Sequence, residues 1–192
     1  NEFVFILNKD QKKFRSLKDR CKDSFDKETD PDGHMAWVHH DLGKAHLELG
    51  EYKDAIKYIK ESIKIFEAEP KNWFINDLGW AYYKCGRNHE DRGEKDEARK
   101  KYKEAIEQYK KAIKLDPKDA HSHFFLGLAL IKNGQLSDAE EELNEASDCF
   151  KGILRNEKLN PTNKEAWIQV ELKLASTKNN LGRIQMEKGS YD

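Results

Sequence analysis

The sequence predicts an all-α fold that is built from repeated pairs of antiparallel helices. A Leu-Gly pair recurs four times, each time with another glycine seven residues later, at Leu42-Gly43, Leu78-Gly79, Leu126-Gly127 and Leu181-Gly182. Three of these units continue with an alanine four residues before a large apolar residue, and three close at a proline. Hydrophobic and charged residues each make up 37% of the 192 residues, which suits stacked amphipathic helices that bury narrow apolar stripes.

The repeated units share a longer pattern. Residues 73–86 carry its first half, from Trp73 through Leu78-Gly79 to Tyr82 and Gly86. Its second half stands at Ala55/Ile59, Ala105/Tyr109 and Ala139/Leu143, with closing prolines at Pro70, Pro117 and Pro161. This pattern resembles the tetratricopeptide repeat over about residues 36–192. The resemblance implies a right-handed superhelix of antiparallel helix pairs, a tetratricopeptide-repeat solenoid, with about three and a half repeats and a role in protein–protein interaction.

The chain is expected to divide into a short N-terminal segment and a repeat array. Residues 1–33 lack the Leu-Gly pattern, but their apolar residues step by three and four from Phe14 to Phe25, which predicts a capping helical segment. Pro31 and Gly33 are expected to end that segment. The array then occupies residues 34–192, with repeats at about 36–70, 71–117, 120–161 and, in part, 163–192. Because the chain ends where a further helix would begin, we expect it to be cut from a longer array.

The first repeat is expected to place helices at about 35–49 and 52–68, but two later hairpins are too long for the family. Gly79 and Gly127 are 48 residues apart, whereas the family repeat has about 34. The surplus between Gly86 and Ala105 is rich in helix formers, so it should lengthen both helices and move the turn to Gly93. Gly127 and Gly182 are 55 residues apart, which predicts long helices at about 136–158 and 163–188.

Composition excludes several functional classes. The net charge of −1 offers no basic surplus for phosphates, which disfavours a nucleic-acid partner. The three cysteines are far apart and form no C-x2-C pair, so we expect no disulfide framework and a cytoplasmic location. No apolar run approaches the ~20 residues of a membrane span, so no membrane partner is expected.

The sequence also lacks the motifs of an enzyme. It contains no glycine-rich phosphate loop, nucleophile elbow or His-Glu-x-x-His, so we expect neither catalysis nor a cofactor. His39 and His46 share one helix face, but they fall on inward-packing positions without a third ligand at helical spacing. No metal site is therefore expected.

The family resemblance implies where a partner would bind. The first helix of each repeat lines the concave face, and the residues flanking its packing positions point into the groove. The predicted partner-binding groove comprises Trp37, His40, Lys44, Trp73, Asn76, Asp77, Trp80, Tyr83, His121, Phe124, Phe125, Leu128, Asn179 and Arg183. Exposed aromatic side chains are typical binding anchors, so a peptide or helix of a partner protein is the expected ligand. Alternatively, these rings pack on one another or on the N-terminal segment.

Five positions of the sequence indicate whether this chain could bind one ligand known for the family, the C-terminal tail of a chaperone. Family members that hold the acidic C-terminus of large chaperones use a clamp of lysine, asparagine and arginine side chains. The corresponding positions here hold His40, Lys44, Asp77, His121 and Phe125, and none of them matches. The acid at position 77 would repel a carboxylate, so binding of a chaperone C-terminal tail is disfavoured.

Two other functions stay open. The long hairpins and partial fourth repeat would suit a self-assembling structural scaffold, a homo-oligomer formed by end stacking or helix exchange. RNA binding has slight support from Lys84, Lys132 and Arg183, but the balanced charge weakens it.

Overall fold

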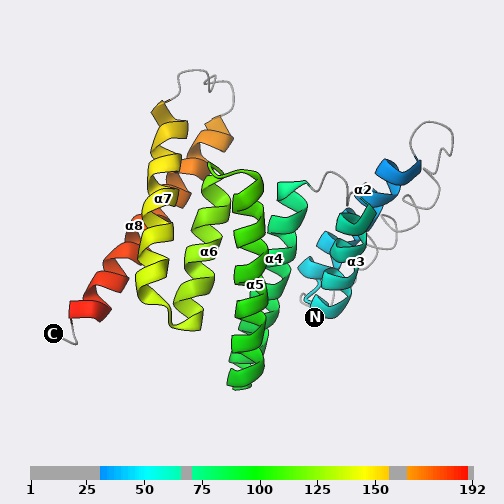
Figure 1. Ribbon diagram of the computed structural model, residues 1–192, viewed down its shortest axis with the longest axis horizontal. Helices are drawn as coiled ribbons and strands as arrows, with labels where there is room; N and C mark the ends of the chain where they lie inside the picture. The colour runs from blue at the N-terminus through cyan, green and yellow to red at the C-terminus, as the bar shows by residue number, and fades with distance from the viewer. Residues whose placement is uncertain (1–30, 66–70, 156–163, 190–192) are drawn as a thin grey trace, which may run out of the picture. The chain divides into compact units, whose positions relative to one another are not determined.

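The computed structural model describes residues 31–65, 71–155 and 164–189, and every described element is helical (Figure 1). The helices are α2 (Pro31–Glu48), α3 (Tyr52–Ile65), α4 (Asn72–Asp91), α5 (Lys95–Leu115), α6 (Ala120–Asn133), α7 (Leu136–Arg155) and α8 (Lys164–Gly189). The all-α prediction is therefore confirmed. The capping segment expected at residues 1–30, and the repeat ends at Pro70 and Pro161, lie outside the described residues.

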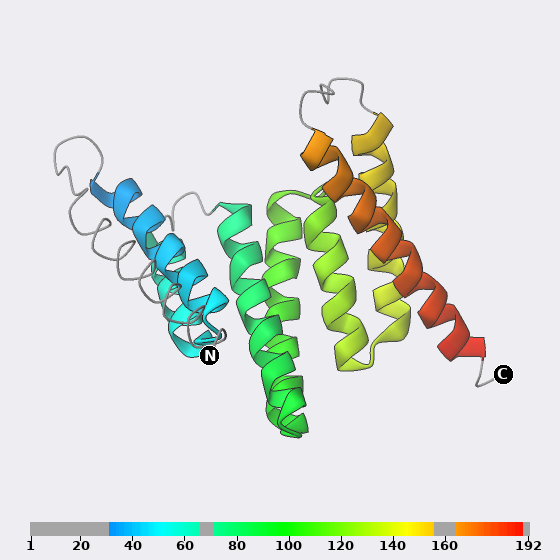
Figure 2. The same cartoon turned by 180° about the vertical axis from the view of Figure 1, so that it is seen from behind.

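The chain forms two compact units, residues 1–81 and 82–192, whose boundary falls within α4. In the first unit α2 and α3 lie side by side (Figures 1 and 2). In the second, α6 lies between α5 and α7, and α8 packs on α7. Each unit has its own core. Ala55, Ile59 and Phe74 are fully buried in the first, and Tyr109, Leu143 and Phe150 are fully buried in the second.

Close packing of α2 on α3 explains why the repeat pattern needs a glycine. A Cβ atom on Gly43 would lie 2.5 Å from Ile59 Cγ1 and 3.1 Å from the Ala55 carbonyl oxygen. Real Cβ atoms essentially never show the first distance, and the second is tighter than most real contacts, so glycine lets the two backbones meet here without displacing Ile59. Gly127 has the same relationship to Leu143 on α7.

The helix hairpin of the second repeat, formed by α4 and α5, is elongated as predicted. Helices α4 and α5 contain 20 and 21 residues, whereas α3 and α6 contain 14 each. The turn lies at Gly93, whose φ of +78° suits glycine, and the Glu94 amide donates to the His89 carbonyl across it. Helices α7 and α8, with 20 and 26 residues, are also long, so the second expected elongation is present.

The start of α2 differs from the expectation. Pro31 was expected to help end the preceding segment, with the first repeat helix beginning near Met35. In the structure Pro31 is the first residue of α2. Proline is well tolerated in the first turn of a helix, because the amide hydrogen that it lacks has no partner there and its φ is already helical.

Candidate partner-binding surfaces

In the first unit, two tryptophans from different helices form an accessible aromatic pair. Trp37 on α2 stacks on Trp73 on α4, with ring centroids 6.3 Å apart and planes inclined by 27°. The two residues are 45% and 47% exposed. Beneath them the fully buried Phe74 meets Trp37 edge-on at 5.0 Å. The pair is therefore anchored in the core on one side and open to solvent on the other.

A histidine–aspartate pair lies beside the tryptophans. His40 is buried, and its Nε2 atom lies 2.7 Å from Asp77 Oδ2. The His40 ring packs against Phe74, with centroids 4.2 Å apart, and meets the edge of Trp37. The Asp77 side chain remains 32% exposed. The acid therefore has a partner within the fold and also presents negative charge next to the tryptophan pair.

The remaining predicted groove residues of the first unit differ in exposure. Lys44 is exposed one helical turn beyond His40 on α2, whereas Asn76 and Trp80 are half-buried on α4. Four predicted site residues of this unit contact one another, and we call them the tryptophan cluster: Trp37, His40, Trp73 and Asp77.

In the second unit, two predicted groove residues are core residues. Tyr83 is buried and packs against Tyr102 of α5, with ring centroids 5.6 Å apart, and burial raises the pKa of its hydroxyl. Phe124 is buried between Phe125 and Phe150. His40 of the first unit is equally inaccessible. These three side chains fill space between helices and offer little surface to a partner.

The ammonium group of Lys173 lies over the ring of Phe125, a contact that the sequence did not predict. Lys173 Nζ lies 4.6 Å from the Phe125 ring centroid and 4.9 Å from that of Phe124. Phe125 in turn stacks on Tyr109 of α5, with centroids 5.9 Å apart. Helix α8 thus places a lysine over the aromatic face of α6. Removal from water holds the pKa of the Lys173 ammonium below its usual range.

The other predicted residues of the second unit lie around this aromatic face. His121 is exposed, meets the edge of Phe150 at 5.4 Å, and has a pKa lowered by desolvation against the opposing effect of Asp119. Leu128 is half-buried on α6. Asn179 and Arg183 are exposed on α8, about two and three turns beyond Lys173. Lys173 is therefore a residue of α8 that contacts the rings, and the packing of α8 in the second unit places it there.

Outside these surfaces, His46, Glu51 and Asp54 gather where α2 turns into α3. Within the described ranges this is the one group of three or more histidine, cysteine or acidic side chains close enough to share a metal ion.

No helix in the described part of the chain combines the length and the apolar character that a membrane crossing requires.

Comparison with protein families identifies the repeats. A model described as "Tetratricopeptide repeat" matches residues 36–68, and a model described as "TPR repeat" matches residues 93–134. The chain contains tetratricopeptide repeats. Together with the helical architecture, this makes it an all-α helical repeat solenoid and places it in a class of protein–protein interaction modules that are generally non-catalytic. A comparison with curated proteins finds no match.

Several solved structures resemble most of this chain. PcrH, in complex with the chaperone binding region of PopD, has a TM-score of 0.58 and 16% identity, covering 78% of this chain and 90% of its own. The Sgt2 TPR domain from Aspergillus fumigatus has a TM-score of 0.55 and 18% identity, covering 82% of each chain. The Yersinia enterocolitica type III secretion chaperone SycD, in complex with a peptide of the translocator YopD, has a TM-score of 0.50 and 22% identity, covering 73% of this chain and 89% of its own. At these identities the likeness concerns the fold.

Proposed function

We propose that this protein is a non-catalytic module that binds a peptide or helix of a partner protein in an aromatic-lined groove, and that the tryptophan cluster is its principal anchor. The observation that carries the proposal is the stacked pair of Trp37 and Trp73, about half exposed on both helices. PcrH and SycD, which share the fold, were each solved with a segment of a partner protein. Both complexes support a peptide partner for this chain as well.

The tryptophan pair has the physical properties of a binding anchor. Stacking on each other and packing on Phe74 restrict the rings, so little side-chain entropy is lost when a ligand covers them. Their exposed faces together offer a large apolar area to a partner. Anchors of this kind typically contribute about 2 kcal/mol or more each to binding.

The charges around Trp37 and Trp73 determine which kind of peptide suits this surface. The Asp77 side chain is 32% accessible and that of Asp41 is 67% accessible, so two carboxylates lie near His40 beside the tryptophans. Indole faces attract cations as well as apolar groups. An apolar segment with neutral or basic neighbours therefore suits this surface, and an acidic tail does not.

A selection experiment tests the proposal with a defined ligand. Peptides selected from a random library on the wild-type protein would be synthesised, and their affinities measured by calorimetry for wild type, Trp37→Ala and Trp73→Ala. We expect the affinity to fall by at least about 30-fold for each variant, which corresponds to about 2 kcal/mol. Equal affinity for wild type and both variants would overturn the proposal.

Trp167→Ala provides the matched control. Trp167 is a half-buried residue of α8 and does not belong to the tryptophan cluster, so its replacement changes the tryptophan content while the four cluster residues are retained. It should leave the affinity unchanged. Circular dichroism and thermal melts would establish that all variants are folded.

Self-assembly is a second candidate, favoured by the outer face of α8. Ile168 and Leu172 are 51% and 57% exposed and lie one helical turn apart, so they form an apolar strip. A second copy of the chain would bury this strip. Sedimentation velocity over a hundredfold concentration range tests the idea, because association should be abolished by Ile168→Glu/Leu172→Glu. A wild-type monomer at every concentration would exclude it.

A further inference from the structure

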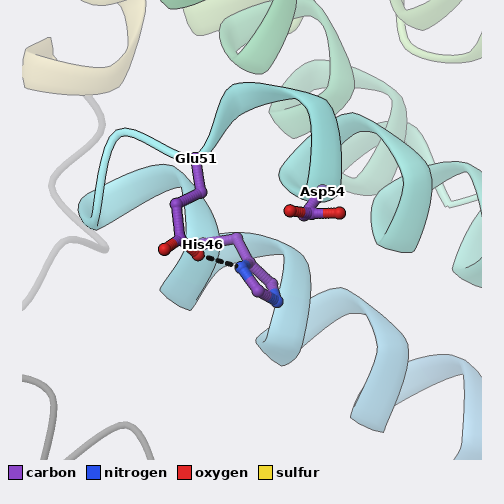
Figure 3. A group of neighbouring side chains, drawn as sticks. All are labelled: His46, Glu51 and Asp54. Carbon is purple, nitrogen blue, oxygen red and sulfur yellow. Dashed lines mark hydrogen bonds and ion pairs between the residues drawn. The ribbon is translucent and has the colours of Figure 1, made fainter.

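Three potential metal ligands meet at the turn between α2 and α3 (Figure 3). His46 lies in the last turn of α2, Glu51 follows Gly50 in the turn, and Asp54 lies in the first turn of α3. One ligand atom from each residue, an imidazole nitrogen or a carboxylate oxygen, lies within 4.8 Å of the other two. His46 Nδ1 and Glu51 Oε2 are 2.6 Å apart.

We propose that His46, Glu51 and Asp54 form a binding site for a divalent transition-metal ion of the Zn²⁺ class. One imidazole nitrogen and two carboxylate oxygens form a ligand set that suits Zn²⁺, which binds such atoms at about 2.0–2.2 Å. In a tetrahedral site these ligand atoms are then about 3.4 Å apart. The observed ligand atoms lie within 4.8 Å of one another, so some of them would have to move closer together to share an ion. A water molecule would complete the coordination.

The backbone holds the three residues in place. Gly50 has a φ of +76°, and the Glu51 amide donates to the His46 carbonyl oxygen at 2.9 Å, so the turn closes tightly between the first two ligands. The His46 ring also stacks on Tyr58 of α3, with centroids 5.1 Å apart and planes inclined by only 8°. The orientation of the imidazole is therefore set by the hairpin. Ligands on rigid elements bind a metal with less loss of entropy than ligands on a loop.

Charge also favours a cation at this turn. Glu51 and Asp54 are exposed and bring two negative charges close together beside one imidazole. A divalent ion would neutralise both carboxylates and remove their mutual repulsion. Imidazole favours Zn²⁺ over Ca²⁺ and Mg²⁺, which prefer all-oxygen sites with more ligands.

The α4–α5 turn is a natural control within the same chain. His89, Gly93 and Glu94 repeat the spacing of His46, Gly50 and Glu51, and His89 Nδ1 is also hydrogen-bonded to the glutamate. Glu97 occupies the position that corresponds to Asp54, yet in the described residues no third ligand atom comes close enough to complete a group here. The two turns therefore share the His–Glu pair and differ in the third ligand. Asp54 therefore decides which of the two turns binds the metal ion.

Helical spacing does not predict this site, because its three ligands do not share one helix. Spacing along α2 pairs His46 with His39, whereas the carboxylates come from the turn and from α3. His39 Nδ1 instead lies 2.8 Å from the Met35 carbonyl oxygen.

Titration of the whole protein with ZnCl₂ at pH 7.5 tests the proposal. Histidine ring signals would be followed by NMR, and affinity would be measured by calorimetry for wild type, Asp54→Asn and Glu97→Gln. We expect the His46 signals to shift and those of His89 to stay, with at least tenfold weaker binding in Asp54→Asn and unchanged binding in Glu97→Gln. Zn²⁺ should also raise the melting temperature of wild type but not of Asp54→Asn, because a bound ion ties α2 to α3.

Two results would overturn the proposal. One is equal Zn²⁺ affinity of wild type and Asp54→Asn; the other is a shift of the His89 signals as large as that of His46. Asp54→Asn alters an exposed side chain and retains a residue tolerated at helix starts, so it should fold. Glu51→Gln removes the other carboxylate of the group, so it should also weaken Zn²⁺ binding at least tenfold, and an unchanged affinity would contradict the proposal as well.

Discussion

Lys173 of α8 lies over the ring of Phe125 on α6, with its ammonium nitrogen 4.6 Å from the ring centroid. The same nitrogen is 4.9 Å from the centroid of Phe124. Within the described part of the chain, no carboxylate forms an ion pair with Lys173. The charge is thus stabilised mainly by the two ring faces while it is partly removed from water. Lys173 also acts electrostatically on His121 and lowers the pKa of its imidazole.

This relationship predicts that Lys173→Met raises the pKa of His121. Methionine keeps an unbranched apolar chain over the rings but removes the positive charge that disfavours protonation of the imidazole. Desolvation, the larger cause of the lowered pKa, would remain, so the value should stay below the ordinary one. An NMR titration of the histidine rings measures the shift. His123 serves as the control, because Glu142 and the Pro117 carbonyl set its pKa and it should not respond.

The helices and their lengths were largely predictable, because they depend on local pattern. The extra charged residues before Ala105 are mostly good helix formers. They contain one glycine, Gly93, and the turn forms there. Glycine at the close helix contacts likewise follows from backbone sterics. Such features are encoded within a few residues of each position.

The positions of side chains between helices were less predictable. The repeat register predicts Tyr83 and Phe124 in the groove, but in the structure Tyr83 packs against Tyr102 and Phe124 packs against Phe150. Lys173 reaches Phe125 because of the way in which α8 packs in the second unit. The crossing of one long helix on another depends on many contacts at once. Periodicity along one helix carries no information about it.

Gly43→Ala should destabilise the protein by about 1–3 kcal/mol, because the added methyl group would overlap Ile59 and press on the α3 backbone. Urea unfolding followed by circular dichroism measures the effect. Gly152→Ala on α7 is the matched control, since an added Cβ there meets nothing within 4 Å. It should raise the free energy of unfolding by about 0.5–1 kcal/mol through helix propensity alone. Equal effects of the two substitutions would contradict the close-packing explanation.

Tyr102→Phe should weaken the contact between α4 and α5 within the elongated hairpin. The Tyr102 hydroxyl donates to Glu90 Oε2 at 2.6 Å, and Lys132 Nζ donates to the same oxygen at 2.8 Å, so one carboxylate joins α4, α5 and α6. Loss of the hydroxyl should cost about 0.5–1.5 kcal/mol in urea unfolding. Lys103→Met, at an exposed position on α5, should leave stability within experimental error. A Tyr102→Phe variant as stable as wild type would show that the hydroxyl contributes nothing.

Glu142→Gln should remove a pH-dependent part of the stability. The His123 Nδ1 atom lies 2.7 Å from Glu142 Oε2, and this carboxylate raises the pKa of the imidazole, with the Pro117 carbonyl as a further acceptor. Because the folded pKa is higher than the unfolded value of about 6.5, the folded state binds the proton more tightly. The added stability is therefore complete below about pH 6.5 and is lost as the pH rises through the folded pKa.

Free energies of unfolding at pH 5.5 and pH 9 measure this contribution. Wild type should exceed Glu142→Gln by about 1 kcal/mol at pH 5.5 and by clearly less at pH 9, where the imidazole is neutral and only an ordinary hydrogen bond remains. Glu141→Gln, at the neighbouring exposed position, should show no such pH-dependent difference. If the gap between wild type and Glu142→Gln is the same at both pH values, or wider at pH 9, the proton on His123 does not stabilise the contact between α6 and α7.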